Sequence, residues 1–278
     1  MPTEKFLEDL TKLQEDSIHG AVYLTLEALK ILKEEVERSS IFSKELKAII
    51  NEIKQTHEEM ASISNVMNNI LAQINKEEEI SQEKMIEIIE KEIHVVKHRE
   101  KKTVENLAKK LRKYQTIMTI SASGTILEAF KEIPQKLRQK IEIYILESRP
   151  MFEGRQQAKK LVQEGFNVYL IVDAAMGFYL GNVEMIIVGA DTIFPDGAAV
   201  NKIGSLPLAV LANYYKKPFF VAASSNKLVN LPTENYPNLI KSRPKKEVMT
   251  ETIQGLEIKN IYFEFIPAEL ITEIISED

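Results

Sequence analysis

The sequence contains no cysteine and no tryptophan among its 278 residues. Without cysteine the chain can form no disulfide, and it offers no thiolate for metal binding or nucleophilic attack. Glycine and proline are also few, with ten of each. The first 110 residues have no glycine after Gly20 and no proline after Pro2. Because these residue types mark most turns, their absence there favours long, uninterrupted helices.

Long apolar runs are missing as well. No run approaches the roughly 20 residues of a membrane span, and the start, MPTEKFLEDL, has no apolar signal core. A formal net charge of −5 argues against broad binding of a nucleic-acid backbone. The short basic segment 241–246 is expected to be a solvated loop. We therefore expect a cytoplasmic protein without membrane or direct nucleic-acid contacts.

Apolar residues at helical spacing dominate the first half. Four such stripes lie within residues 24–36, 42–53, 60–74 and 85–96. Ser81 precedes the fourth stripe as a candidate N-cap, and Glu83 lies in the favourable first turn. Residues 1–110 are therefore predicted to form an N-terminal helical domain.

Short β-prone runs appear after Tyr114 and alternate with helical segments and turns. The six runs are Gln115–Ile120, Glu142–Leu146, Asn167–Val172, Met185–Val188, Phe219–Ala222 and Ile261–Phe265. Strands that alternate with helices indicate a parallel sheet covered on both faces, with right-handed crossovers. Residues 111–278 are therefore predicted to form a Rossmann-like, doubly wound α/β domain.

The most informative stretch is Met185–Ser205, MIIVGADTIFPDGAAVNKIGS. Its apolar opening indicates a strand buried on both faces, and Asp191 is the first charged residue after that strand. Asn201 and Lys202 follow a tight Asp196–Gly197 turn. Since ligands bind outside the carboxyl ends of parallel strands, these polar residues indicate a small-molecule site. Taken singly, Asp191 is better explained as a helix cap and Lys202 as a solvated cation, and it is the whole string that favours a site.

Other predicted strand ends carry further candidates. They are Ser121, Ser123, Gly124 and Thr125 after the first strand, Arg149 after the second, and Lys227 after a later one. Small residues at the start of a helix let backbone N–H groups approach an anion, although plain helix capping is the alternative. Arg149 could pair with phosphate or carboxylate, or it could tie down the loop that follows. The shared location of these residues indicates a site more strongly than any one of them.

No metal or cofactor is expected. All four histidines lie in the helical half, and His94 and His98 could share a helix face four residues apart. Neither an HExxH context nor a third ligand accompanies them, so no metal site is predicted.

The string GADTIFPDGAAVNKIG, residues 189–204, resembles the GAD…G…NKIG signature of one superfamily. That superfamily holds the alpha, beta and delta subunits of translation initiation factor 2B, ribose-1,5-bisphosphate isomerase and methylthioribose-1-phosphate isomerase. Similar segments follow in the expected order across the second half: ESRP at 147–150, DAAMG at 173–177 and IPAEL at 266–270. The resemblance implies a homodimer or higher assembly through the α/β domain, with Phe194, Leu206 and Leu208 as candidate apolar surface.

The same resemblance assigns expected roles to several candidates. Ser121 stands where the isomerases carry their catalytic cysteine, and Asp191 stands at their catalytic aspartate. Lys227 corresponds to the family's phosphate-side lysine. A serine hydroxyl is a much weaker acid than a thiol, whose pKa is about 8.5, so the substitution at Ser121 disfavours proton-transfer catalysis.

The first half carries weaker similarities. Ser17–Ala21, SIHGA, resembles the isomerases' Ile-Arg-Gly-Ala phosphate loop, which makes Gly20 and Ala21 candidate phosphate-binding residues. His19 stands where the isomerases have arginine. A second isomerase arginine, expected near Ile63, is also absent.

Two classes of function remain open. The first is a non-catalytic regulatory protein like the alpha subunit of initiation factor 2B, which binds a sugar phosphate or nucleotide and has other initiation factor subunits as further partners. The second is an aldose–ketose isomerase of the ribose-1,5-bisphosphate isomerase type. The departures at Ser121, His19 and near Ile63 favour the first class and predict negligible turnover. Asp191 favours the second, and the balance on sequence alone lies with the regulatory class.

Overall fold

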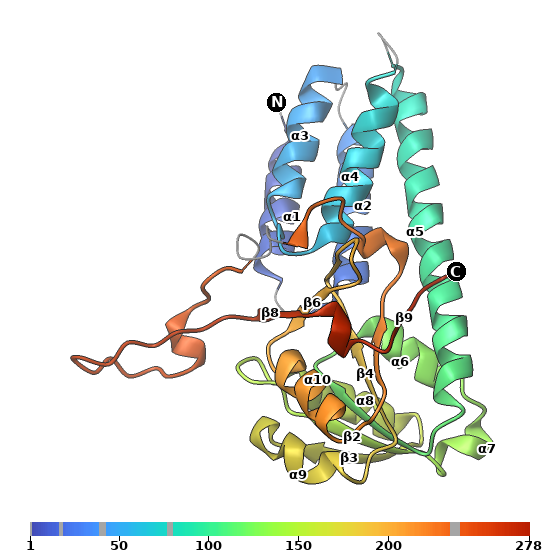
Figure 1. The fold of residues 1–278 in the computed structure, drawn as a ribbon. Coiled ribbons are helices and arrows are strands. Elements are labelled where there is room, and N and C mark those ends of the chain that lie inside the picture. The colour runs from blue at the N-terminus through green and yellow to red at the C-terminus, as the bar shows by residue number, and fades with distance from the viewer. Residues whose placement is uncertain (1, 17–18, 39–42, 77–79, 234–239) are drawn as a thin grey trace.

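The structure is a computed structural model that describes residues 2–16, 19–38, 43–76, 80–233 and 240–278. Ser17 and Ile18 of the expected phosphate loop, and Phe42 of the second apolar stripe, lie outside these ranges. Within them, a helical half precedes an α/β half, from blue to red in Figure 1. The predicted fold class is confirmed.

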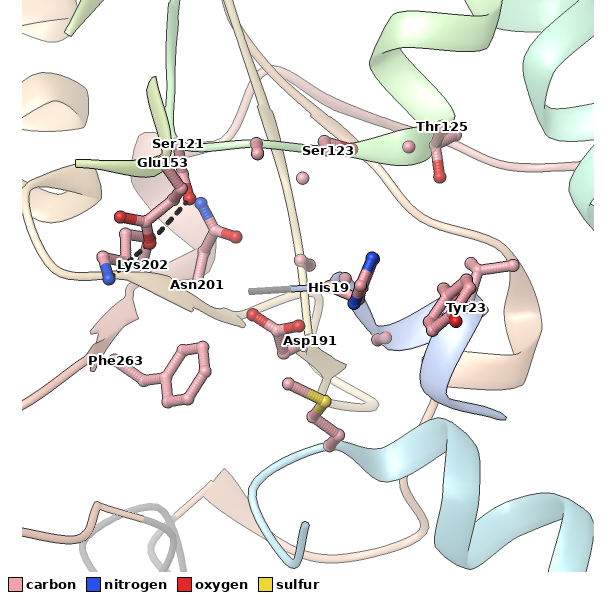
Figure 2. A pocket seen from close by; sticks show the side chains of 18 of the residues that line it. His19, Tyr23, Ser121, Ser123, Thr125, Glu153, Asp191, Asn201, Lys202 and Phe263 are labelled. Carbon is pink, nitrogen blue, oxygen red and sulfur yellow. Dashed lines mark hydrogen bonds and ion pairs between the residues drawn. The ribbon is translucent and has the colours of Figure 1, made fainter. Parts of the chain in front are cut away.

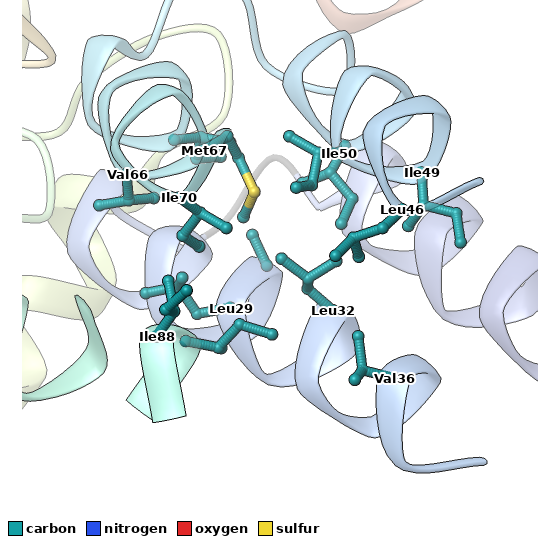
Figure 3. Packing of buried hydrophobic residues seen from close by; sticks show 14 of the residues in the cluster. Leu29, Leu32, Val36, Leu46, Ile49, Ile50, Val66, Met67, Ile70 and Ile88 are labelled. Atoms are coloured by element: carbon teal, nitrogen blue, oxygen red, sulfur yellow. The ribbon is translucent and has the colours of Figure 1, made fainter. Parts of the chain in front are cut away.

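Five helices build the described part of the helical half. They are α1 (Glu4–Glu15), α2 (Ala21–Arg38), α3 (Ser43–Lys54), α4 (Ala61–Ile74) and α5 (Gln82–Leu111). Their apolar stripes meet in one core, in which Leu29, Leu32 and Ile70 are fully buried (Figure 3). Ser81 caps α5 as expected, because its side chain accepts a hydrogen bond from the Lys84 N–H. The helical spacing in the sequence thus predicted these buried faces.

The α/β half is built on a six-stranded parallel sheet in the order β3-β2-β1-β4-β7-β9. Its strands are β1 (Thr116–Ile120), β2 (Glu142–Leu146), β3 (Asn167–Ile171), β4 (Met185–Gly189), β7 (Phe219–Ala222) and β9 (Glu273–Ile275). On one face, α6 (Gly124–Lys131) and α8 (Glu153–Gln163) pack beside the end of α5. On the other face lie α9 (Met176–Leu180) and α10 (Ser205–Tyr214). A short helix, α7 (Gln135–Arg138), precedes β2.

A second, antiparallel sheet corrects the prediction for the last strand. The expected strand Ile261–Phe265 is β8 (Phe263–Ile266), and it pairs with β6 (Ala199–Lys202) rather than joining the parallel sheet. The sixth parallel strand is instead β9, which is only three residues long and therefore too short to be found from an apolar pattern.

The Asp196–Gly197 turn is confirmed, and it connects two strands of this second sheet. Strand β5 (Thr192–Ile193) pairs with β6, and the Phe194 N–H donates to the Ala198 carbonyl at 2.8 Å. Gly197 has a φ of 88°, a left-handed conformation that favours glycine. Asn201 and Lys202 consequently lie on strand β6 and not in a loop.

Two residues expected to form apolar surface are in fact interior. Phe194 is 1% exposed and Leu208 is 0% exposed, so neither can contact another subunit. Leu206 alone of the three keeps partial exposure. An apolar pattern cannot distinguish these cases, because a helix face buried in a core and one buried in an interface have the same spacing.

Helix α5 joins the two halves without a linker. Its side chains up to Val96 pack in the helical core, whereas Leu107, Ala108 and Leu111 pack against the parallel sheet. The boundary expected at residue 110 therefore falls at the end of one continuous helix. The division into domains 1–110 and 111–278 stays a prediction.

Gly154→Ala is expected to destabilise the α/β half. A Cβ at this position would lie 1.9 Å from the Leu146 carbonyl oxygen, so β2 and α8 would have to separate. Overpacking of this kind typically costs about 1–3 kcal/mol, and a clash with backbone lies at the upper end. The melting temperature should fall by several degrees. Gly181→Ala is the control, since its nearest neighbour would lie at 3.8 Å, and an unchanged melting temperature for Gly154→Ala would contradict this packing.

Candidate functional site

A pocket opens where the strand order reverses. From β1 the sheet continues through β2 and β3 on one side, and from β4 through β7 and β9 on the other. Crossover helices leave in opposite directions at such a point, so a crevice remains at the carboxyl ends of the two central strands. The pocket of Figure 2 lies in this crevice, between the ends of β1 and β4 and the start of α2.

The end of β1 supplies one wall. Ser121 has a φ of 66°, which is uncommon for a residue other than glycine, and its N–H donates to Ser148 Oγ at 2.8 Å. Ser123 caps α6 by accepting the Ile126 N–H at 3.3 Å. Thr125 Oγ1 donates to Glu100 Oε1 at 2.5 Å. The segment therefore does cap its helix, and it also lines the pocket together with Gly124.

Asp191 follows β4 and presents its carboxylate to the pocket (Figure 2). Burial raises the pKa of this carboxyl to about 6, although the ammonium groups of Lys227 and Lys202 act in the opposite direction. Its backbone is fixed from both halves: the N–H donates to the Val200 carbonyl at 2.9 Å, and the carbonyl accepts the Ala61 N–H at 3.2 Å. A carboxyl group with this pKa can both donate and accept protons near neutral pH.

Lys202 is 5% exposed and reaches the pocket from β6. Its Nζ lies 2.5 Å from Glu153 Oε1 and 4.6 Å from the centre of the Tyr262 ring. The neighbouring Asn201 donates from Nδ2 to Ser205 Oγ at 2.8 Å. The ammonium group is thus held between a carboxylate and an aromatic face.

Lys227 is also 5% exposed, and it lies in the short helix η2 (Ser225–Lys227) after β7. Within the described residues its ammonium group forms no ion pair. Three elements hold η2 in place. Glu277 accepts the Ser225 N–H at 2.9 Å, Arg99 donates to Asn226 Oδ1 at 2.8 Å, and Asn65 donates to the Asn226 carbonyl at 2.8 Å.

The helical half supplies the opposite wall. Gly20 and Ala21 line the pocket at the start of α2. His19 Nδ1 lies 2.7 Å from Asp16 Oδ2, and its ring stacks on Tyr23 with 4.1 Å between centroids. A cationic form of His19 would therefore be neutralised by Asp16 rather than offered to a ligand.

Arg149 is the one candidate that lies outside the pocket lining. Its N–H donates to Asp173 Oδ2 at 2.7 Å, and its guanidinium donates to the Val248 carbonyl at 3.2 Å and covers the Phe152 ring. These contacts tie down the loop after β2, which is the alternative that the sequence left open.

Sequence reasoning missed several lining residues. Glu153, Met60, Tyr262 and Phe263 all face the pocket. Glu153 had a local signal, because it lies three residues after the ESRP segment that resembles the family. The others come from distant parts of the chain, and no short pattern connects them with a strand end.

Among the described residues, no group of three His, Asp or Glu side chains could hold a metal ion. No described helix combines the length and apolarity needed to cross a bilayer.

The profile of the Initiation factor 2 subunit family matches residues 17–278. The chain belongs to this family. Ribose 1,5-bisphosphate isomerase from Archaeoglobus fulgidus is 28% identical over 278 residues, which cover 99% of this chain and 88% of the relative. A protein from Pyrococcus furiosus named as translation initiation factor eIF-2B subunit 2-like is also 28% identical, over 100% of this chain and 96% of the relative.

Solved structures of the family share the fold. Translation initiation factor eIF-2B from Pyrococcus horikoshii OT3 superposes with a TM-score of 0.86 at 24% identity, covering 99% of this chain and 96% of that one. At this identity the likeness concerns the fold alone.

Asp191→Asn is expected to change stability with pH. Because the folded-state pKa of about 6 exceeds the ordinary value of 3.8, the folded chain binds this proton more tightly than the unfolded chain, so ionised Asp191 destabilises the fold above about pH 6. Two pKa units correspond to at most about 2–3 kcal/mol. The variant should therefore unfold less readily than the unmodified protein at pH 8 and nearly equally at pH 4, as measured by denaturant titration.

Asp196→Asn provides the control for this measurement. A hydrogen bond from Thr233 and one from the Ala198 N–H lower the pKa of Asp196, so this variant should lose stability at pH 8. Equal losses for both variants at pH 8 would contradict the buried environment of Asp191.

Proposed function

We propose that this chain is a sugar-phosphate aldose–ketose isomerase that binds a phosphorylated pentose in the pocket between β1 and β4. The observation that carries the proposal is the meeting of Asp191, with a pKa of about 6, and the two buried lysines Lys202 and Lys227 in one pocket. A relative named ribose 1,5-bisphosphate isomerase, which aligns with 99% of this chain, supports it.

Lys227 marks the phosphate end of the pocket. Its ammonium group is buried and forms no ion pair in the described part of the chain, although it acts on the carboxylate of Asp191, so a phosphate bound beside it would be a direct counter-charge. The N-terminus of α6, with Ser123, Gly124 and Thr125, faces the same pocket and favours an anion. Gly20 and Ala21 bring the start of α2 to its other side.

Asp191 would carry protons at the sugar oxygens. Converting a cyclic aldose phosphate to the open ketose requires one proton to be added to the ring oxygen and one to be removed from the neighbouring hydroxyl. A carboxyl with a pKa of about 6 is present in both forms near neutral pH, so a single group can perform both transfers.

A non-catalytic role like that of an initiation factor 2B alpha subunit is the second candidate. The observation that favours it is Ser121, which stands where the family's isomerases have a cysteine. The relative named eIF-2B subunit 2-like, at the same 28% identity, is consistent with it. Such a protein would bind the same class of ligand in the same pocket without converting it, and initiation factor subunits would be its partners.

Turnover separates the two candidates. In contrast to the negligible turnover expected from the sequence alone, we expect the unmodified protein to form ribulose 1,5-bisphosphate from ribose 1,5-bisphosphate. Asp191→Asn should lower the rate by about 10²–10⁴-fold. A thermal-shift titration with the ligand measures binding, because a ligand at a hundredfold excess over Kd stabilises the folded protein by about 2.7 kcal/mol. Lys227→Ala should weaken binding and therefore reduce this stabilisation. Lys241→Ala, on the surface, is the control. Stabilisation by the ligand without turnover would support the regulatory candidate. If the ligand neither stabilises the protein nor is converted, both candidates are refuted.

Self-association is also proposed, through an extension of the α/β half. The segment between η4 (Lys245–Glu247) and β8 projects away from both halves in Figure 1, and it exposes Ile253 by 49% and Leu256 by 50%. Burial in a second subunit would remove this apolar surface from water.

We expect a dimer or larger species in analytical ultracentrifugation at micromolar concentration, and dissociation by Ile253→Ser with Leu256→Ser. Leu7→Ser, equally exposed on α1, should have no effect; a monomeric unmodified protein would refute the proposal.

A further inference from the structure

Glu153 is a second carboxylate in the pocket, and it occupies an unusual position. It is the first residue of α8, and its side chain is only 12% exposed. Oε1 lies 2.5 Å from Lys202 Nζ and accepts a hydrogen bond from Ser121 Oγ at 3.4 Å (Figure 2). Oε2 is buried and has no hydrogen-bond partner among the described residues.

This arrangement is costly unless a ligand uses it. Buried carboxylate oxygens normally accept hydrogen bonds, and an unsatisfied one destabilises the folded state. Lys202 compensates the charge of Glu153 but contacts only one of its two oxygens. The free oxygen therefore remains available for a group that enters the pocket.

The neighbouring groups leave Glu153 as the suitable base at this end of the pocket. Asp191 and Glu153 are the two carboxylates that line it within the described chain. Ser121 donates its hydrogen bond to Glu153, and a neutral hydroxyl is too weak a base to take a proton from carbon. A carboxylate is a far stronger base than a neutral hydroxyl, and the contact with Lys202 holds this one in position.

We propose that Glu153 is the second acid–base group of this site and that it transfers the proton at carbon, while Asp191 serves the oxygens. The inference rests on the proposed isomerase function. It places the carbon base at the position beside Ser121, where the thiol of the family's isomerases is missing.

The transfers balance without any oxidant or reductant. Glu153 takes the proton from C2, and the C–H electron pair forms the C1–C2 double bond. The bond between C1 and the ring oxygen breaks, and the ring oxygen receives a proton from Asp191. In the resulting enol, the C2 hydroxyl returns a proton to Asp191, the C2 carbonyl forms, and C1 takes back the proton held by Glu153. Both carboxyl groups end in their starting forms.

Glu153→Gln tests this assignment, because it keeps the size and one hydrogen-bond acceptor but removes the base. With ribose 1,5-bisphosphate, kcat should fall by about 10²–10⁴-fold, while KM and the ligand-induced shift in melting temperature should change by less than threefold. Glu153→Asp keeps a carboxylate and should restore part of kcat. A residue that merely positions Lys202 would instead raise KM with little change in kcat.

Two further variants keep the test decisive. Glu147→Gln removes an ion pair of similar length but greater exposure, with Arg155 at 2.6 Å, outside the pocket, and should leave kcat unchanged. Ser121→Ala should lower kcat by no more than about tenfold, since the hydroxyl only contacts the base. If Glu153→Gln does not fold, two other results support the same assignment. Glu153→Asp, which keeps a carboxylate, should retain part of kcat, and Ser121→Ala should have only a small effect on kcat.

The outcomes that contradict the role of Glu153 differ from the outcome that contradicts the isomerase function. Near-normal kcat in Glu153→Gln, or an equally large loss in Ser121→Ala, refutes the role of Glu153 while leaving the isomerase function intact. Absence of turnover in the unmodified protein refutes the isomerase function itself, and the role of Glu153 with it.

Discussion

The parallel pairing of β1 with β4 is the constraint on which the site depends. Ile117 lies opposite Met185 and Met118 opposite Ile186, while the rest of the sheet extends outward from these two strands. Because the crossovers leave on opposite sides, the two carboxyl ends form an uncovered crevice. Gly189 keeps it open: a Cβ there would lie 3.3 Å from Ser123 Oγ.

The helical half adds a second wall to that crevice and makes it a pocket. The Ala61 N–H donates to the Asp191 carbonyl, and Thr192 Oγ1 donates to the Glu59 carbonyl at 3.1 Å, so the start of α4 is fixed directly beside the strand end. Burial is the largest cause of the raised pKa of Asp191. The proton chemistry available to the α/β half is therefore a consequence of packing by the helical half.

The charges in the pocket are arranged asymmetrically. Lys202 and Glu153 form a close ion pair, whereas Lys227 forms no ion pair within the described chain and acts on Asp191, whose pKa is raised to about 6, only through its electric field. A phosphate dianion can be neutralised at Lys227 without displacing Glu153 from Lys202. The two acid–base candidates thus differ in environment, a division that suits opposite roles in proton transfer.

The sequence by itself determined the order of the two halves, five of the six parallel strands and about half of the described residues that line the pocket. Apolar periodicity decides which face of each element is buried, and parallel strands bring their carboxyl ends to one edge, so residues such as Asp191 and Lys227 had to converge. Only the tertiary structure decided the rest. It placed Phe194 in the core, tied Arg149 to the loop outside the pocket and brought Glu153 to Lys202. These outcomes depend on contacts between distant segments, which no local pattern encodes.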